Sequence, residues 1–197
     1  MVAGHFGIAQ FGKGARREIP IALLVVAAYL PDLVRLPLSV TIDRYEIWSH
    51  SIPTVVAMAL ILAVFWILRG GSWAAALVLA AVCALHWPAD VFTGCKPTTF
   101  SGPLLGLVSY RRPVNDLVVE GALLIGGWLF ARRRGFAIGK KWLAIAAAVQ
   151  LAFLVSTYWG AQFIIGQREW TWHPDQTLLP QAHVLEPTTC RAPAEKS

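Results

Sequence analysis

The sequence predicts an all-α polytopic membrane protein, a transmembrane bundle of about five helices preceded by a short N-terminal re-entrant or interfacial helix. The first observation is composition: 56% of the 197 residues are hydrophobic and only 14% are charged, against about 25% charged in an ordinary soluble domain. The second is a series of long apolar runs separated by short charged loops. These features exclude a disordered chain and most soluble enzymes.

The first elements are the least regular. Residues 1–12 are apolar but too short to cross a membrane, so they predict the re-entrant or interfacial helix. The run 19–30 crosses only if the helix continues through Pro31 to Leu38. Basic residues precede this run, as they do in signal peptides, but no small-x-small cleavage pattern follows it.

Four later apolar runs each have about the length that crosses roughly 30 Å of hydrocarbon as a helix. They are residues 52–68, 72–91, 114–130 and 142–165. We therefore expect a membrane-embedded helical domain over residues 1–165 and a polar C-terminal tail over residues 166–197. The last ten or so residues of that tail are expected to be disordered.

Basic residues indicate the orientation. The strongest basic cluster separates the last two runs and is expected in the cytoplasm; it comprises Arg132, Arg133, Arg134, Lys140 and Lys141. Loops 31–51 and 92–113 and the tail then lie outside. This pattern is typical of a multi-pass protein of the bacterial inner membrane.

Two partner or cofactor classes are not expected. The net charge is +6, but the basic residues form no single face or stripe, so no nucleic acid is predicted. The three cysteines, Cys83, Cys95 and Cys190, are far apart and form no CxxC motif. This spacing argues against a disulfide framework and against a thiolate zinc site.

Ionisable side chains near the ends of the spans are the informative residues, because such groups are rare in membranes unless they are functional. They are Asp32, His50, His86, Asp90, Asp116 and Glu120. In an up-and-down bundle all of these positions fall on the same membrane face, the periplasmic one in this orientation. Their convergence predicts a shared site.

The spacing of these groups suggests a metal. His86 and Asp90 are four residues apart, as are Asp116 and Glu120, so each pair projects from one helical face. Imidazole and carboxylate ligands suit zinc, manganese or iron. Pro88 lies inside the first pair and should bend its helix near the site.

For single residues, interpretations without a role in metal binding or catalysis remain open. His50 could be an interfacial histidine, and Asp116 could complement the dipole of its helix. Arg111 and Arg112 precede the fourth run. They could bind an anionic headgroup or simply anchor the helix at the interface.

At these residues the chain resembles the YdjM-like family of inner-membrane-associated metal-dependent hydrolases. The matching pieces are Gly4–His5, LPD at Leu30–Asp32, SHS at Ser49–Ser51, H-x-x-x-D at His86–Asp90 and the loop TGCKPTTFSGP that follows Asp90. The resemblance covers about residues 4 to 120. The family is distantly similar to zinc-dependent phospholipase C and the fungal single-strand nucleases, which are all-helical and hold clustered metals.

The resemblance implies a ligand set of His5, Asp32, His50, His86 and Asp90, with Asp116 and Glu120 as the acidic pair on a later helix. The chain departs from the family at Val34, where an Asp is frequent, and at residues 45–47, where Tyr45 begins a run that replaces a His-Arg-Gly. These departures imply fewer metals or a loss of activity.

The sequence therefore predicts a membrane-bound metal-dependent hydrolase, acting on a phosphate ester such as a lipid headgroup. Zinc is the expected cofactor, membrane lipids are the expected partners, and Glu120 or Asp116 would be a general base or a further ligand. One alternative is a metal or proton transporter. Another is a non-enzymatic membrane protein with a structural metal.

Overall fold

The structure is a computed structural model that describes residues 3–41, 45–101, 103–107, 113–136, 139–165, 170–172 and 178–180. The helices are α1 (Ala3–Ala15), α2 (Ile21–Thr41), α3 (Tyr45–His50), α4 (Ile52–Leu68), α5 (Trp73–Ala84), α6 (His86–Thr93), α7 (Pro113–Arg133) and α8 (Lys140–Ile165). Two short antiparallel pairs complete it: β1 (Lys96–Pro97) with β2 (Leu104–Leu105), and β3 (Trp170–Trp172) with β4 (Leu178–Pro180).

The predicted helical, membrane-like character is confirmed. Three stretches are long and apolar enough to cross a membrane: Ile21–Leu38, Trp73–Thr93 and Val114–Arg133. Helix α4 is a shorter apolar helix, and its outward side chains include Ile61 and Leu68, 66% and 81% exposed. Large apolar side chains facing outward suit a lipid environment. The full number of spans stays a prediction.

The first predicted span proves to be one continuous helix. Helix α2 passes through Pro31 and Pro37 and ends at Thr41, so Asp32 lies inside it rather than after it. Proline in a helix interior removes one backbone hydrogen bond but does not end the helix when neighbouring helices support it.

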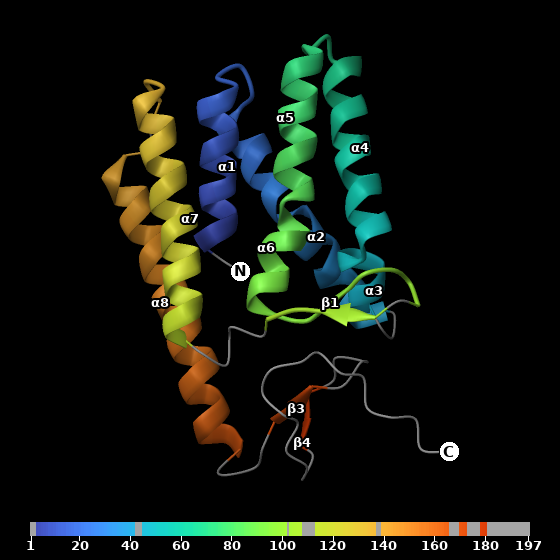
Figure 1. Ribbon diagram of the computed structural model, residues 1–197, viewed down its shortest axis with the longest axis vertical. Helices are drawn as coiled ribbons and strands as arrows, with labels where there is room; N and C mark the ends of the chain where they lie inside the picture. Colours follow the sequence, from blue (N-terminus) through green and yellow to red (C-terminus); the bar gives the residue numbers. More distant parts are fainter. Residues whose placement is uncertain are drawn as a thin grey trace.

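Helix α1 packs inside the bundle. Most of its residues are buried, and in Figure 1 it begins about halfway along α7. Helix α1 is thus a buried part of the helical bundle, and its re-entrant or interfacial position in a membrane stays a prediction. Close approach to α7 depends on two glycines, because a Cβ on Gly7 would overlap the Leu123 carbonyl and a Cβ on Gly127 would overlap that of Gly7. Small residues bring membrane helices together in this way.

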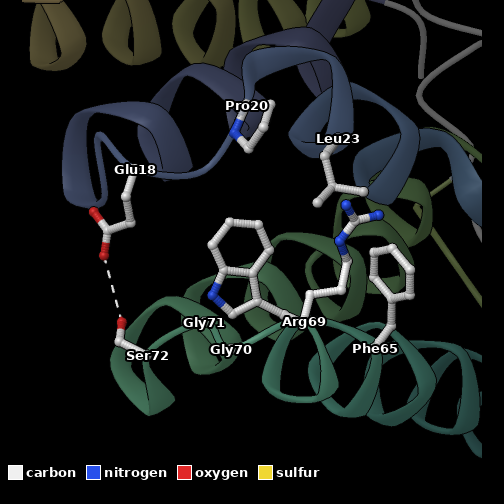
Figure 2. Close-up of a pocket in the computed structure, with 9 residues that line it drawn as sticks. Glu18, Pro20, Leu23, Phe65, Arg69, Gly70, Gly71 and Ser72 are labelled. Carbon is white, nitrogen blue, oxygen red and sulfur yellow. Dashed lines mark hydrogen bonds between the residues drawn. The ribbon is translucent and has the colours of Figure 1, made fainter.

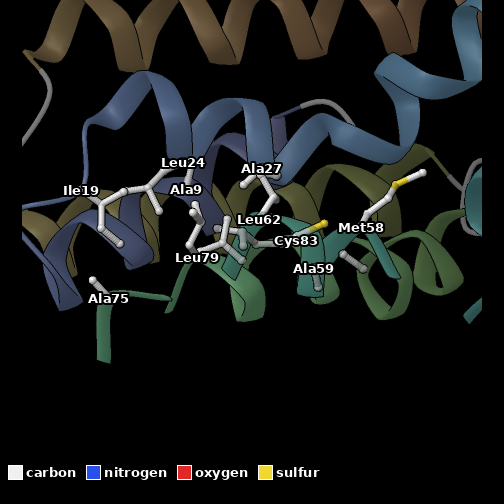
Figure 3. Packing of buried hydrophobic residues seen from close by; sticks show 14 residues of the cluster. Ala9, Ile19, Leu24, Ala27, Met58, Ala59, Leu62, Ala75, Leu79 and Cys83 are labelled. Atoms are coloured by element: carbon white, nitrogen blue, oxygen red, sulfur yellow. The ribbon is translucent and has the colours of Figure 1, made fainter. Parts of the chain in front are cut away.

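A hydrophobic core lies between α1, α2, α4 and α5. It includes Ala9, Leu24, Leu62, Leu79 and Cys83, all buried (Figure 3). Cys83 is therefore a small core residue and not part of a ligand cluster. The core holds in register the helices that carry the polar cluster described below.

The third predicted span is interrupted where Pro88 predicts a bend. Helix α5 ends at Ala84, whose carbonyl has no N–H to accept from at Pro88, and α6 begins at His86. Figure 1 shows α6 continuing roughly in the direction of α5 after this break. The break places His86 at the first position of a new helix.

The connections divide between two ends of the molecule. The α1–α2, α4–α5 and α7–α8 connections lie together at the top of Figure 1, and the loop with β1 lies below, beside α3. The predicted cytoplasmic cluster is at the upper end. In the tail, β3 pairs with β4, Trp170 opposite Pro180. The predicted disorder of the last ten residues concerns residues outside the described part.

A cavity of ≈ 830 Å³ opens between the α1–α2 and α4–α5 turns (Figure 2), which lie at the end of the molecule opposite the loop with β1 (Figure 1). Its one carboxylate is Glu18, which accepts a 3.4 Å hydrogen bond from Ser72 Oγ. Among the described residues that line the cavity there is no histidine or cysteine, so they do not offer the donor set of a transition-metal site.

Candidate metal centre

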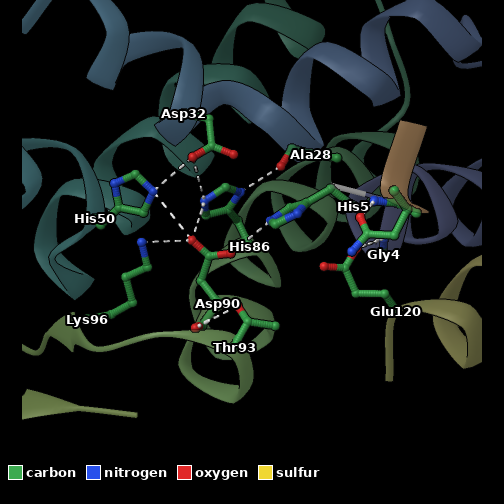
Figure 4. Close-up of polar contacts among 12 residues, drawn as sticks. Gly4, His5, Ala28, Asp32, His50, His86, Asp90, Thr93, Lys96 and Glu120 are labelled. Atoms are coloured by element: carbon green, nitrogen blue, oxygen red, sulfur yellow. Dashed lines mark hydrogen bonds and ion pairs between the residues drawn. The ribbon is translucent and has the colours of Figure 1, made fainter. Parts of the chain in front are cut away.

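Four of the predicted ligands come together from three segments. Asp32 lies in the C-terminal half of α2, His50 is the last residue of α3, and His86 and Asp90 lie one turn apart on α6. One ligand atom from each of the four lies within 4.8 Å of the other three. They form what we call the four-ligand cluster (Figure 4).

Distances inside the cluster match those of atoms that share a metal. His50 Nε2 lies 3.2 Å from Asp32 Oδ1 and 3.5 Å from Asp90 Oδ2. His86 Nε2 lies 3.3 Å from Asp90 Oδ2 and 4.0 Å from Asp32 Oδ1. A tetrahedral zinc ion with bonds of about 2.1 Å separates its ligands by about 3.4 Å. The cluster therefore fits a single divalent ion with small adjustments.

The histidines are oriented by their other ring nitrogens. His86 Nδ1 donates to the Ala28 carbonyl over 2.8 Å, which leaves the Nε2 lone pair directed into the cluster. That Nε2 is buried and has no hydrogen-bond partner among the described residues. His50 Nδ1 contacts Ser49 Oγ at 2.7 Å. An orphaned buried imidazole nitrogen facing two carboxylates is the arrangement that a metal satisfies.

Burial keeps His50 in the ligand form. The fully buried ring is costly to charge, and nearby Lys96 adds positive charge, so the pKa of His50 is lowered to about 4. The imidazole is neutral at pH 7, as a metal ligand must be.

Access to the cluster is on the Asp32 side. The side chains of His50, His86 and Asp90 are 0%, 0% and 3% exposed, whereas that of Asp32 is 35% exposed. A small molecule can therefore approach next to Asp32. A partly open site is typical of catalytic metal centres, while structural sites are closed.

His5 lies on the other side of Asp90. Its Nε2 is 3.6 Å from Asp90 Oδ1, and its ring lies 4.1 Å from that of His86, centroid to centroid. Because α1 enters the bundle, the N-terminal histidine reaches the cluster. The structure thus places His5, the fifth residue of the implied ligand set, next to the four-ligand cluster but not within it.

The acidic pair of α7 has contacts with two other helices, Glu120 with the start of α1 and Asp116 with α8. Glu120 Oε2 accepts from the Gly4 amide over 3.1 Å, and Asp116 Oδ2 accepts from Gln150 Nε2 over 3.2 Å. Carboxylates beside a helix N-terminus are favourable on electrostatic grounds. Glu120 lies beyond His5 in Figure 4 and is not one of the four clustered ligands.

Lys96 is a further residue of the site, and the sequence did not predict it. Its Nζ forms an ion pair with Asp90 Oδ2 at 3.1 Å, and its side chain is 10% exposed. A signal was available: Lys96 is a basic residue in a loop predicted to lie outside, where basic residues are less common. Arg111 and Arg112, the predicted anion-binding residues, lie outside the described part of the chain.

The cysteine prediction requires a correction. Cys95, beside Lys96, is disulfide-bonded, whereas the spacing of the cysteines argued against disulfides. Sequence spacing does not reveal which cysteines the fold brings together.

Comparisons with models of protein families, with curated proteins and with solved structures find no match to this chain.

Proposed function

We propose that the chain is a membrane-bound metal-dependent hydrolase that acts on a phosphate ester such as a lipid headgroup. One observation carries this proposal: a largely buried cluster of two imidazoles and two carboxylates, in which the oriented Nε2 of His86 has no hydrogen-bond partner among the described residues. Placing such a cluster in an apolar bundle costs free energy unless a bound ion compensates its charges.

Asp32, His50, His86 and Asp90 would hold the metal, with His5 as a further ligand beside Asp90. The donor set of nitrogen and oxygen suits zinc, and manganese or iron as alternatives. When bound, a divalent ion would polarise a phosphoryl oxygen and make a coordinated water more acidic. Glu120 and Asp116 are proposed as a general base or further ligands.

The surroundings of the opening support a lipid-like substrate. Asp32 is the exposed ligand, and Leu33 and Leu36 next to it on α2 are 46% and 65% exposed. A polar headgroup at the cluster would thus lie beside apolar side chains able to contact an acyl chain. The apolar helices of the bundle support the same setting.

We propose the bacterial inner membrane as the location and its periplasmic face as the side of the site. The disulfide at Cys95 supports an oxidising compartment for the loop next to the cluster. The basic cluster between α7 and α8 lies at the opposite end, in agreement with the positive-inside rule (Figure 1). The resemblance to YdjM-like hydrolases points the same way.

The first test is metal content. Detergent-purified protein loaded with zinc or manganese is analysed by mass spectrometry beside His86→Ala/Asp90→Ala, with Glu18→Gln as a matched carboxylate control at the other end of the bundle. We expect stoichiometric metal in wild type and control and none in the double variant. Wild-type protein that retains no metal would exclude the proposed centre and favour a proton pathway.

The second test concerns the reaction. Soluble phosphodiesters and phospholipid vesicles are screened for metal-dependent phosphate-ester cleavage, and His86→Ala is tested alongside. Full activity in that variant would contradict the proposal. Stoichiometric metal without any hydrolysis would instead support a structural metal or a transporter.

A further inference from the structure

The cavity between the α1–α2 and α4–α5 turns carries opposite charges at its two ends. Among the described residues that line it, the charged ones are Glu18 and Arg69. Figure 2 shows the Glu18 carboxylate with Ser72 at one end and the Arg69 guanidinium at the other. Within the described part of the chain, Glu18 accepts the bond from Ser72 Oγ and Arg69 lies over the Phe65 ring, 5.6 Å from its centroid. The two charges therefore line one cavity without forming an ion pair with each other.

The size and the wall of the cavity suit a small polar group. Its volume of ≈ 830 Å³ lies within the range of about 300–1,000 Å³ that is usual for ligand sites. The wall includes Pro20, Leu23 and Trp66, so apolar surface accompanies the two charged ends. A Cβ on Gly71 would lie 2.1 Å from Trp66 Nε1, so only a glycine lets the indole pack against this turn.

The cavity lies where lipid headgroups are expected. It is at the end of the bundle that carries the α7–α8 connection and its basic cluster (Figure 1). Large apolar side chains beside it face outward: Phe65, Leu68 and Trp73 are 42%, 81% and 74% exposed. Exposed tryptophan and arginine at the ends of apolar helices are typical of the membrane–water interface. A headgroup in the cavity would thus have apolar side chains nearby for its acyl chains.

We propose that this cavity binds the headgroup of a zwitterionic phospholipid of phosphoethanolamine type, from the leaflet on the side of the basic cluster. The N–H groups of Arg69 match the oxygens of a phosphate. Glu18, held by Ser72, accepts hydrogen bonds from the primary ammonium group. This second lipid contact is at the end of the bundle opposite the metal centre and does not depend on it.

Other common headgroups fit these two charges less well. A quaternary ammonium group has no N–H to donate to the Glu18 carboxylate. An anionic glycerol headgroup can meet Arg69 but brings no positive charge to Glu18. The arrangement therefore predicts selectivity for a headgroup that carries both a phosphate and a primary ammonium group.

A purely structural role of the two charges makes a different prediction. Arg69 is the C-cap residue of α4, where a positive charge is favourable to the helix dipole. The bond between Ser72 and Glu18 joins the two turns. Neither role distinguishes one headgroup from another, so headgroup selectivity separates the two interpretations.

The experiment measures lipid binding to the delipidated, detergent-purified full chain by native mass spectrometry. Phosphatidylethanolamine, phosphatidylcholine and phosphatidylglycerol with identical acyl chains are compared. We expect wild type to bind its first phosphatidylethanolamine about 5-fold more tightly than either of the other two lipids, the effect of one charged contact. Free phosphoethanolamine at the same concentration should not displace the lipid, because it lacks the acyl chains.

Two variants and a matched control locate the effect. Glu18→Gln should weaken binding of phosphatidylethanolamine and tighten that of phosphatidylglycerol, so that the preference falls below about 2-fold. Arg69→Gln should weaken the binding of both. Arg134→Gln is the control, because Arg134 lies over the Phe130 ring at 5.6 Å, as Arg69 does over Phe65, at the same end of the bundle but outside the described lining of the cavity. It should keep the wild-type preference.

Wild type without a headgroup preference would overturn the proposal, whether or not the variants fold. A preference that survives both cavity variants would place the lipid elsewhere. Loss of the preference in Arg134→Gln would indicate a general effect of surface charge, which also contradicts the proposal. Displacement by free phosphoethanolamine would identify a soluble ligand in place of the membrane lipid. Metal content measured on the same samples should be unchanged, which keeps this result separate from the test of the metal centre.

Discussion

His86 Nδ1 donates a hydrogen bond to the carbonyl of Ala28, 58 residues away and on another helix. Ala28 lies three residues before Pro31, in the turn of α2 where a proline weakens the regular backbone pairing. The bond fixes both the tautomer and the direction of the imidazole, so Nε2 faces Asp90 at 3.3 Å. The two prolines of this region, Pro31 on α2 and Pro88 on α6, thus flank the contact that orients one ligand.

The contact of Ser49 with the imidazole of His50 provides a first prediction. Ser49 Oγ contacts His50 Nδ1, so Ser49→Ala removes a group that holds the ring. We expect metal affinity to fall about 10- to 100-fold, as for other groups behind metal ligands. Zinc competition titration measures it. Ser51→Ala is the matched control, because Ser51 Oγ contacts Thr54 Oγ1 and not the ring. Equal losses in the two variants would refute an orienting role for Ser49.

Metal removal should destabilise the wild-type fold. A ligand that binds only the folded state stabilises it by about 2.7 kcal/mol when present at 100 times its Kd. Zinc should therefore raise the melting temperature of chelator-treated protein in detergent. The His86→Ala/Asp90→Ala variant should melt at one temperature with or without zinc. A zinc-dependent shift in that variant would indicate binding elsewhere.

Much of the fold follows from the sequence because its signals are strong and local. The run 52–68 coincides with α4, Ile52–Leu68, because uninterrupted apolar residues in lipid leave few alternatives to a helix. The convergence of Asp32, His50, His86 and Asp90 agrees with the expectation from their places along the apolar runs, although Asp32 lies inside α2 rather than at its end.

The remaining features depend on tertiary contacts that no local pattern encodes. The contact of Lys96 with Asp90 requires the path of an irregular loop. The disulfide at Cys95 depends on which segments meet. The inward position of α1 depends on how closely Gly7 and Gly127 let two helices approach, and composition does not reveal that distance.

The close packing of α1 against α7 can be tested by adding one methyl group at the contact. A methyl group at Gly127 would overlap the carbonyl of Gly7, whereas Gly121 on the same helix has nothing within 4 Å of a built Cβ. Gly127→Ala should destabilise the protein by about 1–3 kcal/mol or more, because overpacking displaces backbone. Gly121→Ala should be neutral or slightly stabilising. Thermal unfolding in detergent measures both, and similar melting temperatures would contradict the close packing.

A lipid substrate predicts that a substitution beside Asp32, at the opening of the site, lowers the cleavage of lipids but not of soluble substrates. Leu36 lies one turn after Asp32 and is 65% exposed, so Leu36→Asn removes apolar contact beside the cluster without altering a ligand. Cleavage of a vesicle phospholipid should fall several-fold, while cleavage of a short soluble phosphodiester should not change. Leu68→Asn, exposed at the other end of the bundle, should affect neither substrate. A parallel loss on both substrates at Leu36 would indicate distortion of the metal centre.

Substitution of Glu120 can distinguish a role in the reaction from a role in anchoring α1. Its Oε2 accepts a hydrogen bond from the Gly4 amide, and the amide oxygen of glutamine can accept the same bond without the charge. We expect Glu120→Gln to keep its melting temperature and to lose about 10²- to 10⁴-fold in hydrolysis, as when a general base is removed. Metal content measured on the same sample separates the loss of a base from the loss of a ligand. Unchanged hydrolysis would mean that Glu120 only anchors α1. Its negative charge would then stabilise the N-terminal end of that helix.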